Sequence, residues 1–171
     1  EDVSDMIYLS VGYGIGAGIV VNGKQCRGSE GFAGDVGHMV IDPNGPQCPC
    51  GKKGCWEVMA SSIAAGESFK SLAEKAESGD PAAISMLNKI GCNLGIGISN
   101  LINVLNPQLV VLGGEVVHAG KWVMNPCRST VRERAWPWVV EHTRIDFSGV
   151  TGEYAASVVG TMTKVIEYFL D

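Results

Sequence analysis

A cluster of one histidine and three cysteines constrains the fold of this chain more than any other feature. His38, Cys48, Cys50 and Cys55 lie within eighteen residues of sequence. One imidazole and three thiolates suit tetrahedral Zn²⁺, because soft sulfur donors disfavour Mg²⁺ and Ca²⁺. The sequence therefore predicts a zinc ion that ties this segment into one compact loop.

The spacing of the cluster indicates which kind of site it forms. The pattern C-x-C-x₄-C is not the common zinc-finger spacing, and four protein ligands leave no position for water, which favours a structural ion. Gly51 and Gly54 allow the backbone to fold tightly around it. The alternatives are three reduced cysteines beside an unrelated histidine, or disulfides, although the crowding of three among six cysteines favours a metal. Cys26, Cys92 and Cys127 are isolated, and we interpret them as ordinary thiols.

The rest of the chain alternates strand-like and helix-like segments, beginning with an expected β-hairpin. Its apolar runs, Met6–Val11 and Ala17–Val21, flank a glycine loop, and Asn22-Gly23 after the second run is a strong hairpin turn. Helical spacing follows the cluster at Val58, Ala65, Phe69, Leu72 and Ala76, with Gly79 as a C-cap. Asp80-Pro81 begins a long helix that Asn106-Pro107 stops. The remaining expected elements are strands over His38–Ile41, Gln108–Leu112 and Thr143–Phe147, and helices over Trp122–Arg134 and Tyr154–Leu170.

This order of elements predicts one α/β domain with helices packed on a sheet. The chain has 171 residues, which is enough to form a hydrophobic core. Its composition, 46% hydrophobic and 18% charged residues, excludes a disordered tail or a coiled coil. A net charge of −5 without a basic run excludes a nucleic-acid-binding surface within these residues. No apolar stretch suits a membrane span and no signal peptide opens the chain, so we expect a cytoplasmic protein. The start at Glu1, directly before a strand, is expected of a segment cut from a longer protein.

Glycine supplies 23 of the 171 residues, about twice the usual share. Gly12, Gly14, Gly16 and Gly18 alternate along one segment, which clears one face of an extended chain for a ligand or another backbone. The segment has no dinucleotide fingerprint, and a P-loop is excluded because Gln25 stands where a metal-binding Ser or Thr is required. The alternative to a ligand loop is a glycine-rich hairpin packed against a helix.

Four segments together resemble the ROK family (repressor, open reading frame, kinase) of sugar kinases and sugar-responsive repressors. They are GYGIGAGIVVNGK, like the family's second phosphate loop; EGFAGDVGHMVIDPNG, like its sugar-binding segment; CPCGKKGCWE, like its zinc motif; and NPQLVVLGGEV, like its adenosine-side strand and turn. The resemblance implies an actin-like ATPase (ribonuclease H-like) fold, with a mixed sheet flanked by helices and a zinc loop. It also implies that residues 1–171 form a single C-terminal ROK-type domain. The family's N-terminal half, its catalytic Asp and the repressors' DNA-binding domain would be absent.

The resemblance assigns roles to individual residues of the loop. The family's zinc ligands fall on the four residues of the cluster, and its sugar-hydroxyl contacts fall on Asp35, His38 and Glu57. One ring nitrogen of His38 would bind zinc while the other faces a sugar hydroxyl, and each carboxylate accepts hydrogen bonds from adjacent hydroxyls. Without the resemblance, Asp35 would be a solvated loop acid and Glu57 an acid favoured by a helix N-terminus.

Nucleotide contacts are carried over onto two glycine segments. Gly12, Gly14 and Gly16 match the phosphate loop, and Gly113 and Gly114 match the adenosine-side turn. ATP would occupy these segments only if the complete protein is a kinase.

Three positions bear on the choice among the family's functions. Tyr13 stands where family kinases usually carry Thr, whose hydroxyl helps hold phosphate, and Asp35 is one methylene shorter than the usual Glu. Trp56 resembles the repressor branch, particularly its xylose-type repressors. We therefore expect a sugar-sensing, effector-binding domain of a transcriptional regulator with structural zinc. The alternatives are the C-terminal half of an ATP-dependent sugar kinase and a zinc-stabilised scaffold for dimerisation.

The expected partners follow from the resemblance. They are a small sugar, a second copy of the chain in a homodimer, and DNA only through an absent N-terminal domain; no membrane is expected. Trp136-Pro137-Trp138 belongs either to the dimer surface or to the edge of the core.

Overall fold

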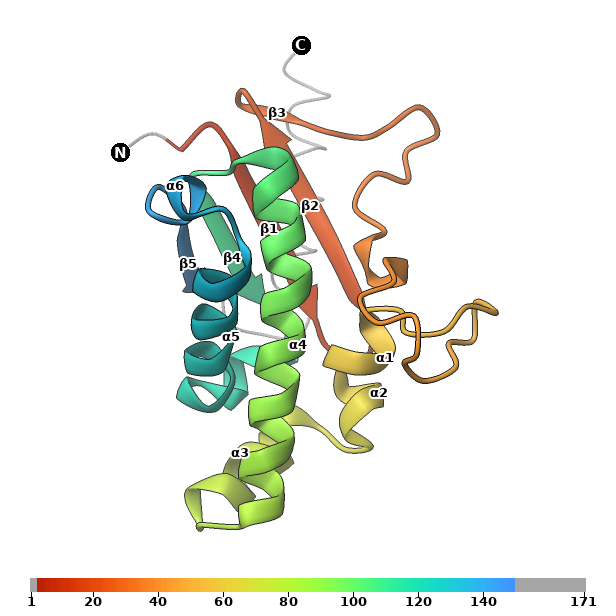
Figure 1. Cartoon of the computed structure of the whole chain (residues 1–171), viewed down its shortest axis with the longest axis vertical. Coiled ribbons are helices and arrows are strands. Elements are labelled where there is room, and N and C mark those ends of the chain that lie inside the picture. Colours follow the sequence, from red (N-terminus) through yellow and green to blue (C-terminus); the bar gives the residue numbers. More distant parts are fainter. Residues whose placement is uncertain (1–2, 150–171) are drawn as a thin grey trace, which may run out of the picture.

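The computed structural model describes residues 3–149, which form a five-stranded mixed sheet crossed by two long helices (Figure 1). The strands lie in the order β3-β2-β1-β4-β5. β1 pairs antiparallel with β2 and parallel with β4, and β4 pairs parallel with β5. Their bounds are β1 Met6–Val11, β2 Ile15–Val21, β3 Lys24–Gln25, β4 Leu109–Gly113 and β5 Arg144–Phe147. The expected α/β class and the mixed sheet are confirmed.

The helices include two that dominate the structure, α4 (Pro81–Leu105) and α5 (Lys121–Arg134). They lie side by side across one face of the sheet, as Figure 1 shows. The shorter elements are η1 Val36–His38, α1 Glu57–Ala60, α2 Ser62–Ala65, α3 Phe69–Glu77, η2 Glu115–Ala119 and α6 Pro137–Val140. Among the described residues, no helix is both long and apolar enough to cross a membrane.

One hydrophobic core lies between the sheet and these helices. On β1, Ile7, Leu9 and Val11 are almost fully buried, as expected for a strand that presents every second side chain to one face. They join one cluster with Val110 and Leu112 of β4 and with Leu87, Ile90, Leu94, Ile98 and Ile102 of α4.

Small residues set how closely α4 approaches α5. An added Cβ at Gly91 would lie against the ring of Pro126, and one at Gly95 would lie 2.7 Å from the carbonyl oxygen of Cys127. Glycine at both positions therefore allows close backbone contact, at the expense of some helix propensity. α4 and α5 therefore pack closely against one another.

The ends of α4 agree with the sequence prediction. The Asp80 carboxylate accepts a hydrogen bond from the N–H of Ala82 at 2.8 Å, and Pro81 occupies the first turn. Asn106 adopts the left-handed conformation (φ 46°) that ends the helix. Gly79 likewise has a positive φ of 88° just after α3.

The predicted strand His38–Ile41 is wrong. The turn η1 (Val36–His38) ends where that strand was expected to begin. The carbonyl of Met39 then accepts a hydrogen bond from the N–H of Trp56 at 2.8 Å. Because these backbone groups bond to the cysteine loop, the segment belongs to the site and not to the sheet.

The helical stripe after the cluster is divided among three helices, α1, α2 and α3. Ser61 is extended (φ −109°, ψ −176°), and its hydroxyl accepts a hydrogen bond from the N–H of Ile63, so one helix ends and the next begins. Gly66 ends α2 with a φ of 73°, and the hydroxyl of Ser68 caps α3. Local capping therefore overrides the apolar periodicity in this segment.

The remaining differences are small. β2, β4 and β5 begin within two residues of their expected starts, and α6 (Pro137–Val140) was not predicted. The expected helix Tyr154–Leu170 lies outside the described residues. Trp136 and Trp138 are 64% and 65% exposed, so they lie at the surface; the homodimer stays a prediction.

Candidate functional site

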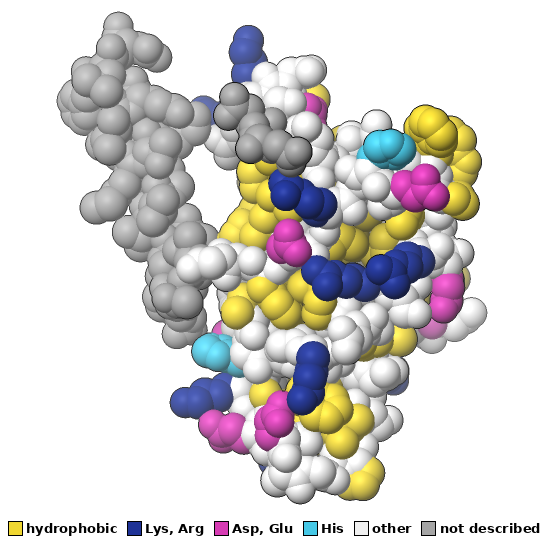
Figure 2. Space-filling model, turned by 90° about the vertical axis from the view of Figure 1, so that its left-hand side faces the viewer, with side chains coloured by type: hydrophobic (Ala, Val, Ile, Leu, Met, Phe, Trp, Pro, Cys, Tyr) yellow, Lys and Arg dark blue, Asp and Glu magenta, His cyan; other side chains and the backbone are white. Residues whose placement is uncertain are grey.

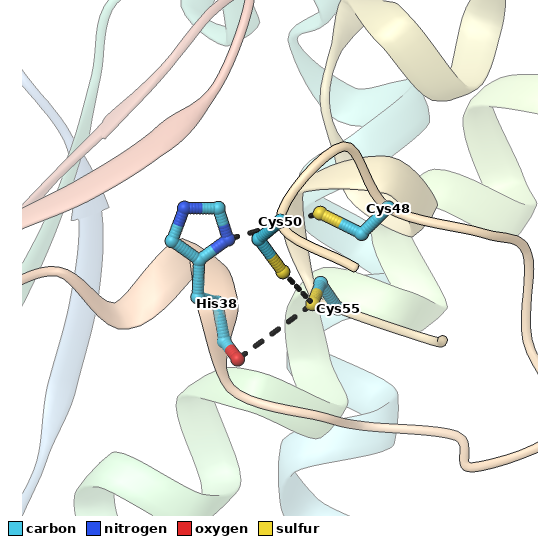
Figure 3. A group of neighbouring side chains, drawn as sticks. All are labelled: His38, Cys48, Cys50 and Cys55. Carbon is cyan, nitrogen blue, oxygen red and sulfur yellow. Dashed lines mark hydrogen bonds between the residues drawn. The ribbon is translucent and has the colours of Figure 1, made fainter. Parts of the chain in front are cut away.

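The four predicted metal ligands lie together, as Figure 3 shows. Their ligand atoms are all within 4.8 Å of one another. The Sγ of Cys48 is 3.8 Å from Nδ1 of His38, and the Sγ atoms of Cys50 and Cys55 are 3.5 Å apart. Cys48 and Cys55 are buried, whereas Cys50 is exposed. The fold thus joins the end of η1 to the loop that precedes α1.

This arrangement fits a zinc ion. With Zn–S bonds of about 2.3 Å, tetrahedral sulfur ligands lie about 3.8 Å apart. The 3.5 Å separation of the Cys50 and Cys55 sulfurs is close to that spacing, and the Cys48 sulfur lies 3.8 Å from the His38 ring nitrogen. The donor set of three sulfurs and one imidazole nitrogen is the one that structural zinc prefers.

The thiols of the loop differ in their acidity. Burial, reinforced by the neighbouring Cys50 thiol, raises the pKa of Cys55 to about 12. At Cys50, the backbone N–H of Lys52 lowers the thiol pKa by stabilising the thiolate. A metal that binds here must therefore displace a proton from Cys55, and its affinity rises with pH.

A buried tryptophan anchors the loop to α4. Trp56 is fully buried, and its Nε1 donates a hydrogen bond to the carbonyl of Asn93 at 3.0 Å. The Asn93 amide in turn donates to the carbonyl of Met59 at 2.8 Å. The indole lies where a Cβ on Gly97 would stand, so only glycine leaves room for it. Trp56 follows Cys55 directly, and it therefore fixes one end of the cluster against the core.

Two glycines form the sharp bends of the loop, as the sequence predicted. Gly51 and Gly54 have φ values of 91° and 69°. A side chain at Gly54 would also collide with the carbonyl of Asp42. Only glycine adopts such bends at low energetic cost.

His38 and Glu57 lie side by side at the edge of the cluster. Nδ1 of His38 is 3.4 Å from Oε1 of Glu57, and its other ring nitrogen points away from the cysteines (Figure 3). The side chains are 37% and 17% exposed, so both are open to solvent in part. Oε2 of Glu57 would be 3.1 Å from a Cβ on Gly14 and 3.3 Å from one on Gly37. Glu57 therefore reaches the predicted phosphate loop as well as the predicted metal site.

Asp35, the third predicted sugar contact, is close to His38 in sequence but makes no side-chain hydrogen bond with the cluster among the described residues. Asp35 lies immediately before η1 and is exposed. Within the described part of the chain, its carboxylate has no hydrogen bond or ion pair. An exposed carboxylate three residues from His38 could either contact a sugar hydroxyl or be an ordinary solvated acid of the loop. The role of Asp35 in sugar binding therefore stays a prediction.

The two predicted nucleotide segments lie together at the ends of β1 and β4. A Cβ on Gly114 would be 2.7 Å from the carbonyl oxygen of Val11, the residue before Gly12. The carbonyl of Gly12 accepts a hydrogen bond from the N–H of Ser62 at 2.8 Å. The glycine hairpin thus contacts the start of α2, as its alternative interpretation expects, and phosphate binding by Gly12, Gly14, Gly16, Gly113 and Gly114 stays a prediction.

Sequence reasoning missed one acidic residue in this region. Glu115 begins η2 directly after the glycine pair, and its Cγ would be 3.8 Å from a Cβ on Gly12. A carboxylate here repels phosphate oxygens at the predicted phosphate loop. Tyr13, in the same loop, is 80% exposed. Glu115 is easily recognised in the sequence as an acidic residue. Its proximity to Gly12 could not be predicted, because it depends on the pairing of β1 with β4.

The family profile that matches this sequence is that of the ROK family, over residues 1–162. The chain belongs to the ROK family. This confirms the expected resemblance and accounts for the actin-like fold.

One curated relative and two solved structures illustrate the range of the family. The xylose repressor of Bacillus spizizenii is 36% identical over 177 residues, which cover 98% of this chain and 46% of the repressor. The structure of a ROK family transcriptional regulator, a homolog of the E. coli MLC protein, has a TM-score of 0.77 and 31% identity over 85% of this chain and 42% of that one. A ROK family glucokinase from Streptomyces griseus, in complex with glucose and AMPPNP, has a TM-score of 0.77 and 26% identity over 91% of this chain and 58% of that one.

The chain spans about half the length of the relatives that it resembles. Both repressors and kinases are among them, so family membership does not by itself choose between these activities.

Proposed function

We propose that this chain is the sugar-sensing half of a ROK-family transcriptional regulator, in which a structural zinc ion shapes the effector site. The observation that carries the proposal is the placement of His38. Its Nδ1 lies 3.8 Å from the Sγ of Cys48 and 3.4 Å from Oε1 of Glu57, while its second ring nitrogen points away from the cysteines. One imidazole can therefore serve the metal and a ligand at once.

Zinc bound at Nδ1 would fix the tautomer of His38. The proton then resides on the outer ring nitrogen, which donates a hydrogen bond to a sugar oxygen. The carboxylates of Glu57 and Asp35 accept hydrogen bonds from sugar hydroxyls. One donor and two acceptors suit a polyhydroxylated ligand, whose hydroxyls both give and accept hydrogen bonds.

The residues proposed to bind the sugar also contact other parts of the domain. Glu57 approaches Gly14, and the Ser62 N–H bonds to the carbonyl of Gly12, so α1 and α2 touch the β1–β2 hairpin. A sugar that bound one arrangement of these contacts better would shift the domain toward it. DNA binding and its response to the sugar belong, in this proposal, to the complete regulator.

The kinase is the second candidate, and the structural likeness to the glucokinase favours it. Two features of the phosphate loop argue against it. Tyr13 provides an exposed phenol in place of the threonine hydroxyl, and Glu115 brings a negative charge beside Gly12. We therefore place the regulator first and the sugar kinase second.

A substitution at Glu57 tests the sugar site. In the zinc-loaded protein, Glu57→Gln is expected to weaken binding of the effector sugar about 10- to 100-fold, because it removes a charge-assisted hydrogen bond. Calorimetric titration with D-xylose and with D-glucose measures the affinity. Glu141→Gln, at an exposed position beyond α6, is the matched control and should bind as the parent does.

Zinc content and thermal unfolding of both variants show whether the loop is intact. Equal sugar affinities for Glu57→Gln and Glu141→Gln, with zinc retained, would remove Glu57 from the site.

A further inference from the structure

A pocket lies on the far side of α4 from the cysteine loop. It has a volume of about 250 Å³ and is formed by α5, α6, β5 and the last turn of α4. Figure 1 shows α5, α6 and β5 on one side of α4 and the cysteine loop on the other. Nothing in the sugar site or the glycine segments uses this pocket.

Arginine is concentrated in this pocket. The chain has five arginines, and three of them, Arg128, Arg132 and Arg144, line it. They face one carboxylate, that of Asp146. In a chain with a net charge of −5, this is a local excess of positive charge. Figure 2 shows basic side chains gathered across the middle of this face, over hydrophobic surface.

The internal contacts of the pocket leave most of this charge unbalanced. Arg128 donates to the carboxylate of Asp146 at 3.1 Å and to the carbonyl of Ile145. Within residues 3–149, Arg132 and Arg144 have no acidic partner. Arg128 and Arg132 are four residues apart on α5, where like charges repel one another. An anion between them would relieve that repulsion.

The walls of the pocket favour a small organic anion over a bare ion. Ile102, Val131, Val140 and Ile145 supply apolar surface beside the guanidinium groups. Guanidinium groups bind carboxylate and phosphoryl oxygens in a two-pronged geometry. A pocket of this size, lined by both guanidinium groups and apolar side chains, suits a small organic ligand that carries an oxyanion.

An added peptide strand is disfavoured at the same place. Among the described strands, β5 lies at one of the two edges of the sheet, and an edge strand can accept a further strand through its backbone groups. On that edge, the guanidinium of Arg128 already donates a hydrogen bond to the carbonyl of Ile145. A strand would have to displace this guanidinium, whereas an anion would only add to it.

We propose that this pocket binds an oxyanion group, phosphoryl or carboxyl, borne on a small organic molecule. Arg132 and Arg144 are its principal contacts, and Arg128 shares its charge between the ligand and Asp146. The pocket shares no residue with the proposed sugar site.

Titrations with three anions test this proposal. Inorganic phosphate, glycerol 3-phosphate and succinate are each titrated into the chain by calorimetry at low ionic strength, with glycerol as the uncharged comparison. Binding of the two phosphates alone identifies a phosphoryl ligand, and binding of succinate alone identifies a carboxylate. Arg132→Gln and Arg144→Gln are each expected to weaken that binding at least about tenfold.

Two further variants separate a site from general surface charge. Arg134→Gln removes an arginine of α5 that does not line the pocket and should leave the affinity unchanged. Asp146→Asn frees Arg128 from its carboxylate and is expected to tighten binding several-fold, which a purely structural role for Asp146 does not predict. The proposal is overturned if none of the anions binds at millimolar concentration, or if Arg134→Gln weakens binding as much as Arg132→Gln does.

Discussion

Replacement of Cys55 by serine is expected to weaken zinc binding by at least about 100-fold. Cys55 is one of four ligands whose donor atoms lie within 4.8 Å of one another, and it is fully buried. Loss of a residue that merely supports a ligand typically lowers metal affinity about 10- to 100-fold, so loss of a ligand itself should have a larger effect. Competition with a chelator of known affinity measures the change.

The same experiment has an internal control and a pH dependence. Cys26→Ser alters an exposed cysteine outside the cluster and should leave zinc affinity unchanged. Because burial raises the pKa of Cys55 to about 12 in the metal-free loop, zinc must displace its proton, and affinity should rise with pH. Undiminished zinc binding by Cys55→Ser would exclude Cys55 from the site.

Replacement of Trp56 by alanine is expected to lower the free energy of unfolding by about 3–5 kcal/mol, the range for a fully buried large aromatic residue. The indole is fully buried, and it donates a hydrogen bond to the carbonyl of Asn93 on α4. Gly97 provides the space that the ring fills, so its removal leaves a cavity. Urea-induced unfolding of the zinc-loaded protein measures the change.

Trp138→Ala is the matched control, because that side chain is 65% exposed and its loss should change stability by less than about 0.5 kcal/mol. Trp56→Phe retains part of the ring and loses the hydrogen bond, so it should give an intermediate loss and remain folded. A loss below about 1 kcal/mol for Trp56→Ala would show that the loop does not depend on this anchor.

Local chemistry made much of the fold predictable from the sequence. The hairpin turn at Asn22-Gly23 and the two ends of α4 depend on residues within a few positions of one another. The cluster of four potential metal ligands was equally visible, because one histidine and three cysteines crowd into eighteen residues. Such features need no knowledge of the packing.

The errors arose where tertiary contacts or competing caps decide the structure. The segment His38–Ile41 has the apolar content of a strand, yet its backbone bonds to the cysteine loop. Ser61 interrupts an apolar stripe that would otherwise support one helix. The approach of Glu115 to Gly12 exists only because β1 pairs with β4. No pattern within a short stretch of sequence carries that information.

One measurement tests the central claim most directly: titration of the protein with D-xylose and D-glucose, before and after removal of zinc, in the presence of Mg-ATP. Calorimetry follows binding, and product analysis follows transfer of phosphate to the sugar. The account predicts saturable binding of a sugar by the zinc-loaded protein, no sugar phosphate, and loss of binding when zinc is removed. ATP-dependent formation of a sugar phosphate, or sugar binding that survives complete removal of zinc, would contradict it.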